Sequence, residues 1–128
     1  MAKDVIVPDT MKTNYQQLHF APAVRDGDRL FCSGQTGSAA DGSLSKDPAE
    51  QFRQAWENVK TVVEAGGSSL DDIIEITSYH VGFNEHIAAF MQTKDACVSE
   101  PYPAWTAIGV SELAFGALAE IRVIARVR

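Results

Sequence analysis

Few side chains in this 128-residue sequence combine catalytic chemistry with a suitable position. Glu120 lies in the alternating run 119–127, on the same strand face as Arg122. A carboxylate in such a place either handles a proton or forms a solvated ion pair. Arg122 follows roughly 6–7 Å along the strand, so it could pair with Glu120 or bind an anionic ligand. On the residues alone, these interpretations stay open.

Other reactive side chains do not form a recognisable catalytic or metal-binding pattern. Ser33 lies outside any Ser-x-Gly elbow and has no positioned His, which favours polar lining over a nucleophile. His80 and His86 have no Asp or Cys ligand pattern around them, so no metal site is expected. Cys32 and Cys97 form no CxxC and are expected to be buried free thiols. The glycines form no nucleotide fingerprint, and no cofactor is expected.

Apolar stripes at helical spacing predict two helices. Asp47 should cap the first, with Pro48 at its first position and Glu50 placed for a capping box, and Gly66-Gly67 should end it. Asn84 should cap the second, which ends before Pro101. The two stripes are Phe52, Trp56, Val59, Val62 and Val63, and then Ile87, Phe90 and Met91 with Cys97 near the end.

Runs of β-branched and aromatic residues predict strands at 29–35, 73–81, 105–110 and 119–127, with one more extended piece among residues 5–24. In the 73–81 run, one face should carry Ile73, Glu75, Thr77, Tyr79 and Val81, and the other Ile74, Ile76, Ser78 and His80. The order predicts a single α+β domain over residues 1–128, with two helices on one face of a mixed sheet of five or six strands. Because no third helix is expected to cover the opposite face, cyclic self-association is expected.

Charge and hydropathy exclude several function classes. The formal net charge is −6, and Lys and Arg do not cluster with aromatic residues, so nucleic acid is a poor partner. No stretch approaches the roughly 18 apolar residues of a membrane span, and the first residues lack a signal-peptide pattern. We therefore expect a cytoplasmic protein without membrane or nucleic-acid partners.

Three passages carry a family resemblance. They are Leu30-Phe-Cys-Ser-Gly-Gln35, the block from Trp56-Glu-Asn-Val-Lys60 through Leu70-Asp-Asp-Ile-Ile74, and Pro103-Ala-Trp-Thr106 with Ala119-Glu-Ile-Arg-Val-Ile-Ala125. Together they resemble the RidA (YjgF-type) reactive-intermediate deaminase family, which is also described as endoribonuclease L-PSP-like. The resemblance implies a homotrimer of chorismate-mutase-like fold with a small-molecule cleft between subunits. It also implies cofactor-free hydrolysis of enamines or imines to a 2-keto acid and ammonia.

The resemblance assigns roles residue by residue. Ser33 and Gly34 match the family's Ser-Gly pair, and Glu120 matches its water-handling glutamate. Trp105 stands where the family has the arginine that binds the substrate carboxylate, so standard 2-imino acids are doubtful substrates. Two roles stay open for Trp105: an anchor in the subunit interface and a stacking surface for a planar ligand. Arg122 is a candidate substitute for the missing charge.

The remaining matches are looser. Phe20 corresponds most nearly to the family's cleft tyrosine, and Met91 to its asparagine on the second helix. Ala107 stands where the family has a cysteine, and Thr106 follows Trp105 on the other side of the strand. The resemblance therefore predicts a cleft that is more aromatic and less cationic than is usual for the family.

Two functions from different classes follow. The first is a trimeric cleft enzyme that hydrolyses a small imine, enamine or related compound, with Glu120 handling water. The second is a non-catalytic ligand-binding or regulatory trimer that keeps the fold. Ribonuclease activity, which is sometimes attached to the family, fits the acidic charge poorly.

Overall fold

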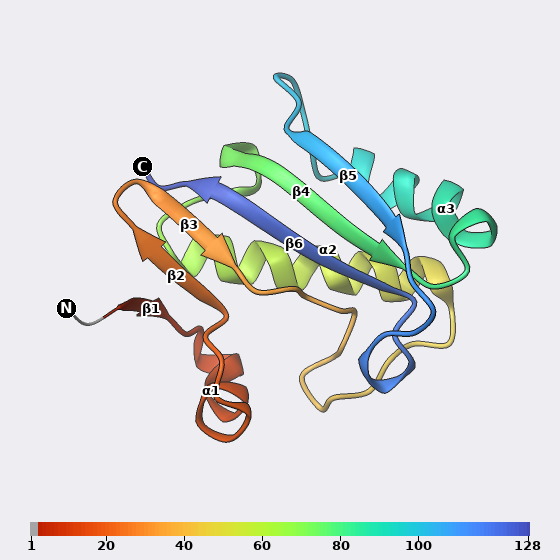
Figure 1. Ribbon diagram of the computed structural model, residues 1–128, viewed down its shortest axis with the longest axis horizontal. Coiled ribbons are helices and arrows are strands. Elements are labelled where there is room, and N and C mark those ends of the chain that lie inside the picture. Colours follow the sequence, from red (N-terminus) through yellow and green to blue (C-terminus); the bar gives the residue numbers. More distant parts are fainter. Residues whose placement is uncertain (1–2) are drawn as a thin grey trace.

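The computed structural model describes residues 3–128, which form a mixed sheet with helices beside it (Figure 1). The strands are β1 (Asp4–Ile6), β2 (Ala23–Asp26), β3 (Arg29–Cys32), β4 (Ile73–His80), β5 (Ala104–Gly109) and β6 (Ala119–Arg126). The helices are α1 (Lys12–Leu18), α2 (Pro48–Ala65) and α3 (Phe83–Asp95), with short 3-10 turns at Asp9–Met11, Leu70–Asp72 and Ala114–Gly116. The expected α+β class is confirmed. Among these residues, no helix has the length and apolar character needed to cross a membrane.

The strand order places β6, the last described strand, in the middle of the sheet beside β3. The order is β1-β2-β3-β6-β4-β5, and only β4 and β5 run parallel within residues 3–128. A parallel pair needs a crossover connection, which α3 supplies. Because β3 and β6 are antiparallel, with Phe31 opposite Ile124, the residues that follow β3 lie beside the start of β6.

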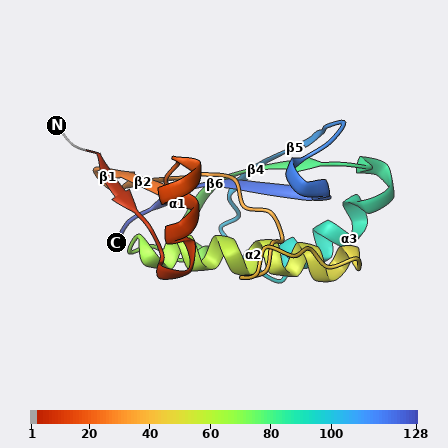
Figure 2. The ribbon, with the colours of Figure 1, turned by 90° about the horizontal axis from the view of Figure 1, so that it is seen from below.

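Helices α2 and α3 lie together on one side of the sheet, and in the described range no helix covers the opposite side (Figure 2). The expectation of only two helices was wrong, because α1 is a third. Its seven residues have no side-chain cap, and Tyr15 and Leu18 are too few to form a helical stripe. None of its residues is buried, and it lies beside the sheet towards the α2 side (Figure 2). The opposite sheet face therefore stays open.

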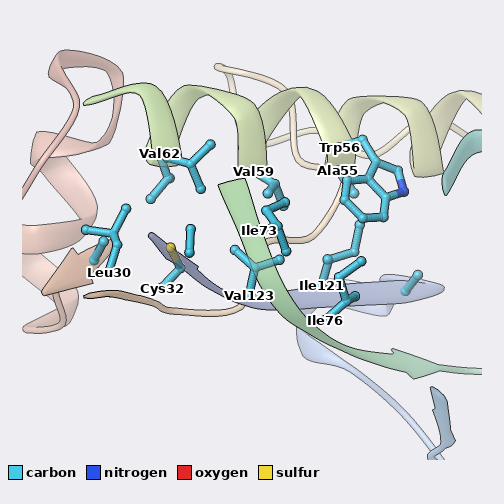
Figure 3. Close-up of a cluster of buried hydrophobic side chains, with 14 of the residues drawn as sticks. Leu30, Cys32, Ala55, Trp56, Val59, Val62, Ile73, Ile76, Ile121 and Val123 are labelled. Atoms are coloured by element: carbon cyan, nitrogen blue, oxygen red, sulfur yellow. The ribbon is translucent and has the colours of Figure 1, made fainter. Parts of the chain in front are cut away.

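The core fills the space between α2 and the sheet (Figure 3). Burying one such large apolar side chain contributes about 1.5–3 kcal/mol to folding. The predicted alternation of β6 is confirmed, since Ile121, Val123 and Ala125 are buried and Arg122 and Ile124 are not. The buried residues from α2 are Gln51, Phe52, Ala55, Trp56, Val59, Val62 and Val63, which include the whole predicted stripe.

The start of α2 follows the predicted cap only in part. The Asp47 side chain accepts a hydrogen bond from the Ala49 N–H at 3.2 Å, as expected of an N-cap residue. Glu50 does not complete a capping box, because its carboxylate pairs with Arg53 one helical turn later. One side-chain cap therefore serves this helix end.

The predicted faces of β4 are confirmed from Glu75 to His80 but were wrong at the start of the strand. The register against β6 shifts between Ile73 and Glu75, which marks an irregularity in the strand. As a result Ile73 and Ile76 are both buried, whereas Ile74 is 37% exposed. An extra residue in one strand reverses the alternation of faces, and a pattern of period two does not show it.

The start of α3 also differs from the prediction. The helix begins at Phe83, directly after Gly82, whose φ of 64° is left-handed. A glycine takes this conformation at little cost, so the turn and not a side chain starts the helix. Asn84 lies inside the first turn, and no side-chain cap bond is formed at this end.

The C-terminus is tied to the turn before β4 by a largely enclosed carboxylate. Asp72, whose side chain is 5% exposed, accepts hydrogen bonds from Arg128 Nε at 2.5 Å and Ser69 Oγ at 2.9 Å. The Arg128 guanidinium and the Ser69 hydroxyl hold the pKa of Asp72 below its usual range. The Arg128 side chain is 76% exposed, so solvent weakens the pair.

Replacing Asp72 with Asn should lower the free energy of unfolding at pH 7 by about 1 kcal/mol. Because the pKa of Asp72 is lower in the folded protein than in the unfolded chain, its contribution is complete above about pH 4. It is lost as the pH falls through the lower folded-state value. Urea denaturation of both proteins from pH 7 to pH 2 measures the difference. The exposed Asp4→Asn variant is the control, and an equal effect in both variants would contradict the role of the Arg128 pair.

Candidate functional site

The segment after β3 is fixed at two points. Ser33 Oγ donates to the Ala21 carbonyl at 2.7 Å, and the Ser33 N–H donates to the Pro22 carbonyl at 2.9 Å. Two residues later, Gln35 and Ile121 exchange both backbone hydrogen bonds. Gly34 lies between these anchors, and within residues 3–128 its N–H donates to no recorded acceptor. Within the described range the Gly34 N–H is therefore an unpaired donor between two fixed points of the backbone.

The Glu120 carboxylate lies directly against Gly34. It comes from the second residue of β6 and is half-buried on the open side of the sheet. A Cβ at position 34 would lie 2.3 Å from Glu120 Oε2, so only a residue without a side chain permits this placement. In the described range this carboxylate forms no ion pair, not even with Arg122 on the same strand face. An unpaired acceptor therefore lies beside an unpaired donor.

Phe20 belongs to the same neighbourhood. It precedes Ala21, whose carbonyl accepts the Ser33 hydroxyl, and its side chain is 40% exposed. We call Phe20, Ser33, Gly34 and Glu120 the glutamate group. Within one chain the fold places Gly34 against Glu120 and joins Ser33 to Ala21, the neighbour of Phe20, and the functional roles of the four residues stay predictions.

Trp105 lies on the other face of the sheet and two strands away. Its ring stacks on Phe90 of α3 with the ring centres 6.5 Å apart, which places it on the helix side of β5. Its indole Nε1–H donates to Ser78 Oγ at 2.9 Å. The Lys94 ammonium lies 4.6 Å from the centre of the ring. Both the ring and the N–H of Trp105 thus have partners in its own chain.

A buried polar pair on β4 holds the indole in place. Ser78 Oγ lies 2.7 Å from His80 Nε2, and both residues are almost fully buried. Burial lowers the pKa of His80, so its ring is neutral at pH 7. Among residues 3–128, His80 Nδ1 has no hydrogen-bond partner. The Ser78 hydroxyl therefore links Trp105 to a neutral histidine in the core.

Met91 and Thr106 lie near Trp105 in sequence or structure but do not share its surroundings. Met91 is on α3, where its side chain is 40% exposed. Thr106 is exposed on the open face of β5, opposite Thr77 of β4. Their proposed contacts with a ligand stay untested predictions.

One chain does not bring Glu120 and Trp105 together. Glu120 is in register with Tyr79, whereas Trp105 is in register with Ile76, three residues along β4. Across two strand spacings and three residues, the backbones of the two residues are roughly 13–14 Å apart, and their side chains lie on opposite faces. Since β5 is an edge strand, Trp105 remains within reach of a neighbouring molecule.

The thiols and metal-binding side chains form no second site. Both cysteines are free, with Cys32 buried and Cys97 half-buried, although both were expected to be buried. Burial raises the pKa of the Cys32 thiol to about 12, so it is not a nucleophile at neutral pH. In the part of the chain that the structure describes, no three His, Cys, Asp or Glu residues are grouped to hold a metal ion.

Comparison with known proteins identifies the family. The sequence model described as Endoribonuclease L-PSP matches residues 12–127, nearly the whole chain. The chain belongs to the RidA (YjgF-type) family. The family match begins after β1 and the first 3-10 turn, so both precede the matched region.

Relatives in this family agree in sequence and fold. The RutC family protein YjgH of Escherichia coli K12 is 39% identical over 126 residues, which are 98% of this chain and 95% of that protein. A solved structure of protein YJGH, 38% identical, matches with a TM-score of 0.91 over 99% of this chain and 98% of its own. A 2-iminobutanoate/2-iminopropanoate deaminase of Dermatophagoides farinae is 32% identical over 82% of this chain and 83% of its own length.

Sequence reasoning missed the residues that surround Trp105. Ser78 and His80 alternate on the inner face of β4, and their link to Trp105 depends on the parallel register of β4 and β5. Lys94 lies four residues after Phe90, so both side chains are on one face of α3. That spacing was a usable signal, although the prediction of this helix rested on its apolar residues alone.

The Trp105–Ser78 hydrogen bond should be measurable in a double-mutant cycle. Trp105→Phe and Ser78→Ala should each lower the free energy of unfolding, and the coupling between them should be about 0.5–1.5 kcal/mol. Urea denaturation of the wild type, both single variants and the double variant gives this coupling. A coupling near zero would mean that the indole N–H is free to bind a ligand.

Proposed function

We propose that the chain forms a homotrimer of chorismate-mutase-like fold that binds or hydrolyses a small enamine- or imine-like metabolite in clefts between subunits. We further propose that it has little activity on standard 2-imino acids. The observation that carries this proposal is the unpaired Glu120 carboxylate against the backbone of Gly34. The deaminase name of the Dermatophagoides farinae relative supports the reaction class.

The glutamate group has the parts that imine hydrolysis needs. Water adds to the carbon of the C=N bond while Glu120 accepts one of its protons. That proton passes to the nitrogen, which gives a carbinolamine. The hydroxyl proton of the carbinolamine then also moves to the nitrogen by way of Glu120 while the C–N bond breaks, so ammonia leaves and a carbonyl compound remains. The Gly34 N–H can donate to a polar atom of the substrate and hold it in place. No cofactor is needed for these steps.

The chemistry of Trp105 is the reason why low activity on 2-imino acids is expected. An arginine offers a charged two-pronged donor to a carboxylate, but an indole offers one neutral N–H. In this chain that N–H is already bound to Ser78. Trp105 therefore offers a ligand only part of its ring.

The open face of the sheet supports self-association. Phe31 is 40% exposed and Ile108 is 38% exposed on this face, and no helix within residues 3–128 covers it (Figure 2). Association buries such apolar residues. A cleft between subunits would also combine the glutamate group of one copy with the β5 edge of the next.

A non-catalytic binding trimer is the second candidate. The observation that favours it is the fixed indole of Trp105, which packs between its own Phe90, Ser78 and Lys94. Ribonuclease activity has less support, because the net charge is −6 and an acidic protein repels a polyanion.

Light scattering coupled to size exclusion should give a mass close to three times the 13.9 kDa of one chain. Replacing Phe31 and Ile108 together with Glu should shift the protein towards monomers, because charge on the open face opposes its burial. Leu18→Glu, on the exposed face of α1, is the control variant. A monomeric wild type at micromolar concentration would contradict the proposed assembly.

Wild-type protein should hydrolyse 2-iminopropanoate little faster than the uncatalysed background, because nothing in its site orients the carboxylate at two points. An amino-acid oxidase generates the imine, and the amount of imine that remains is measured as the semicarbazone it forms with semicarbazide. Trp105→Arg should restore part of the activity, provided that the glutamate group keeps its geometry.

Adding Glu120→Ala to Trp105→Arg should remove the gain, because both residues act on one substrate. Glu120→Gln tests the charge with the shape retained. Robust wild-type turnover that depends on Glu120 but not on Trp105 would show that another cation, with Arg122 the first candidate, binds the carboxylate.

A further inference from the structure

The Lys94 ammonium is held in an unusual place for a lysine. Its side chain is only 13% exposed, although it lies in the last turn of α3. It is positioned over the Trp105 ring, 4.6 Å from the ring centre. Lysine heads normally reach into water, so this placement keeps a positive charge beside the aromatic surface of β5.

We propose that Lys94 and Trp105 form an anion-binding site for a small planar ligand with a single carboxylate. The ammonium attracts the carboxylate, and the exposed part of the indole contacts the planar portion of the ligand. The inference rests on the proposed function for its cleft, and it specifies the class of ligand that enters. The positive charge that binds the ligand carboxylate then comes from Lys94 on α3, and not from Arg122 or from a residue of β5.

The charge of Lys94 is only weakly neutralised within its own chain. Its one recorded ion pair within residues 3–128 is with the neighbouring Asp95, at 2.9 Å. The Asp95 side chain is 65% exposed, and a pair so open to water is weak. Solvent screens the attraction between Lys94 and a ligand carboxylate less when that carboxylate lies between the subunits. Such a ligand can therefore replace Asp95.

The site differs from an arginine fork in what it can do. A lysine acts as a point charge with rotating donors, so it attracts a carboxylate without fixing its plane. Binding therefore survives the loss of the arginine, while orientation for hydrolysis does not. This division is consistent with the weak turnover of 2-imino acids that we propose, and it predicts that their products still bind.

The two tryptophans of the chain allow a direct test. In ¹⁵N-labelled protein each indole N–H gives one NMR signal, and Trp105→Phe assigns them. Titration with 2-oxobutanoate should shift the Trp105 signal and leave that of Trp56, which lies in the core, unchanged. The uncharged 2-oxobutanamide should bind at least about 10-fold more weakly.

Variants of Lys94 distinguish the effect of its charge from the effect of its size and shape. Lys94→Met should weaken 2-oxobutanoate binding about 10-fold or more, and Lys94→Arg should keep it within about threefold. Asp95→Asn should strengthen binding about two- to threefold, because it removes the competing carboxylate. Lys46→Met, a change of the same kind in an exposed loop, is the matched control and should bind like wild type.

The results that would contradict the anion site differ from those that would contradict the proposed hydrolysis. Equal binding by wild type and Lys94→Met, equal binding of the acid and the amide, or no shift of the Trp105 signal at 10 mM ligand would overturn the anion site. Binding that depends on Lys94 without any imine hydrolysis would support the anion site and count against the catalytic proposal alone. Imine hydrolysis that persists in Lys94→Met, together with equal binding of 2-oxobutanoate by the two proteins, would support the catalytic proposal and overturn the anion site.

Discussion

Phe90 is the contact through which α3, α2 and the sheet are fixed to one another. Its ring is fully buried and lies 4.5 Å from His80, 5.6 Å from Phe52, 6.2 Å from Trp56 and 6.5 Å from Trp105, measured between ring centres. Edge-to-face packing of such rings adds to the free energy of simple burial. The place of Lys94, one turn later on α3, follows from this packing.

The residues with chemistry form two sets that the sheet keeps apart. Glu120 and Gly34 lie on the open face of the middle strands, where donor and acceptor groups remain unpaired. Trp105 and Lys94 lie on the helix side of the edge strand, where each has partners within the chain. The first set suits proton transfer to and from water, and the second suits attraction of an anion. A function that uses both requires more than one copy of the chain.

Sequence reasoning succeeded where the signal is local. Asp47, Pro48 and the apolar stripe fixed α2 almost to the residue, and alternation identified the inner face of β6. It failed where one residue changes a regular pattern, as at the irregularity near Ile74 and the left-handed Gly82. The contact of Gly34 with Glu120 within one chain was not predicted, since it depends on the pairing of distant strands. The face of Trp105 was not predictable, because β5 has no clear two-sided pattern.

The pairing of β3 with β6 also has a consequence for the order in which the protein assembles. Ser78, Phe90, Lys94 and Trp105 all lie within one strand–helix–strand unit, so their contacts close short loops. Gln35 and Ile121 come from opposite parts of the chain, and joining them closes a loop of more than eighty residues, at a larger entropic cost. During synthesis β6 also emerges last. The aromatic surroundings of Trp105 can therefore form before β6 has been synthesised, whereas the surroundings of Glu120 require β6 itself.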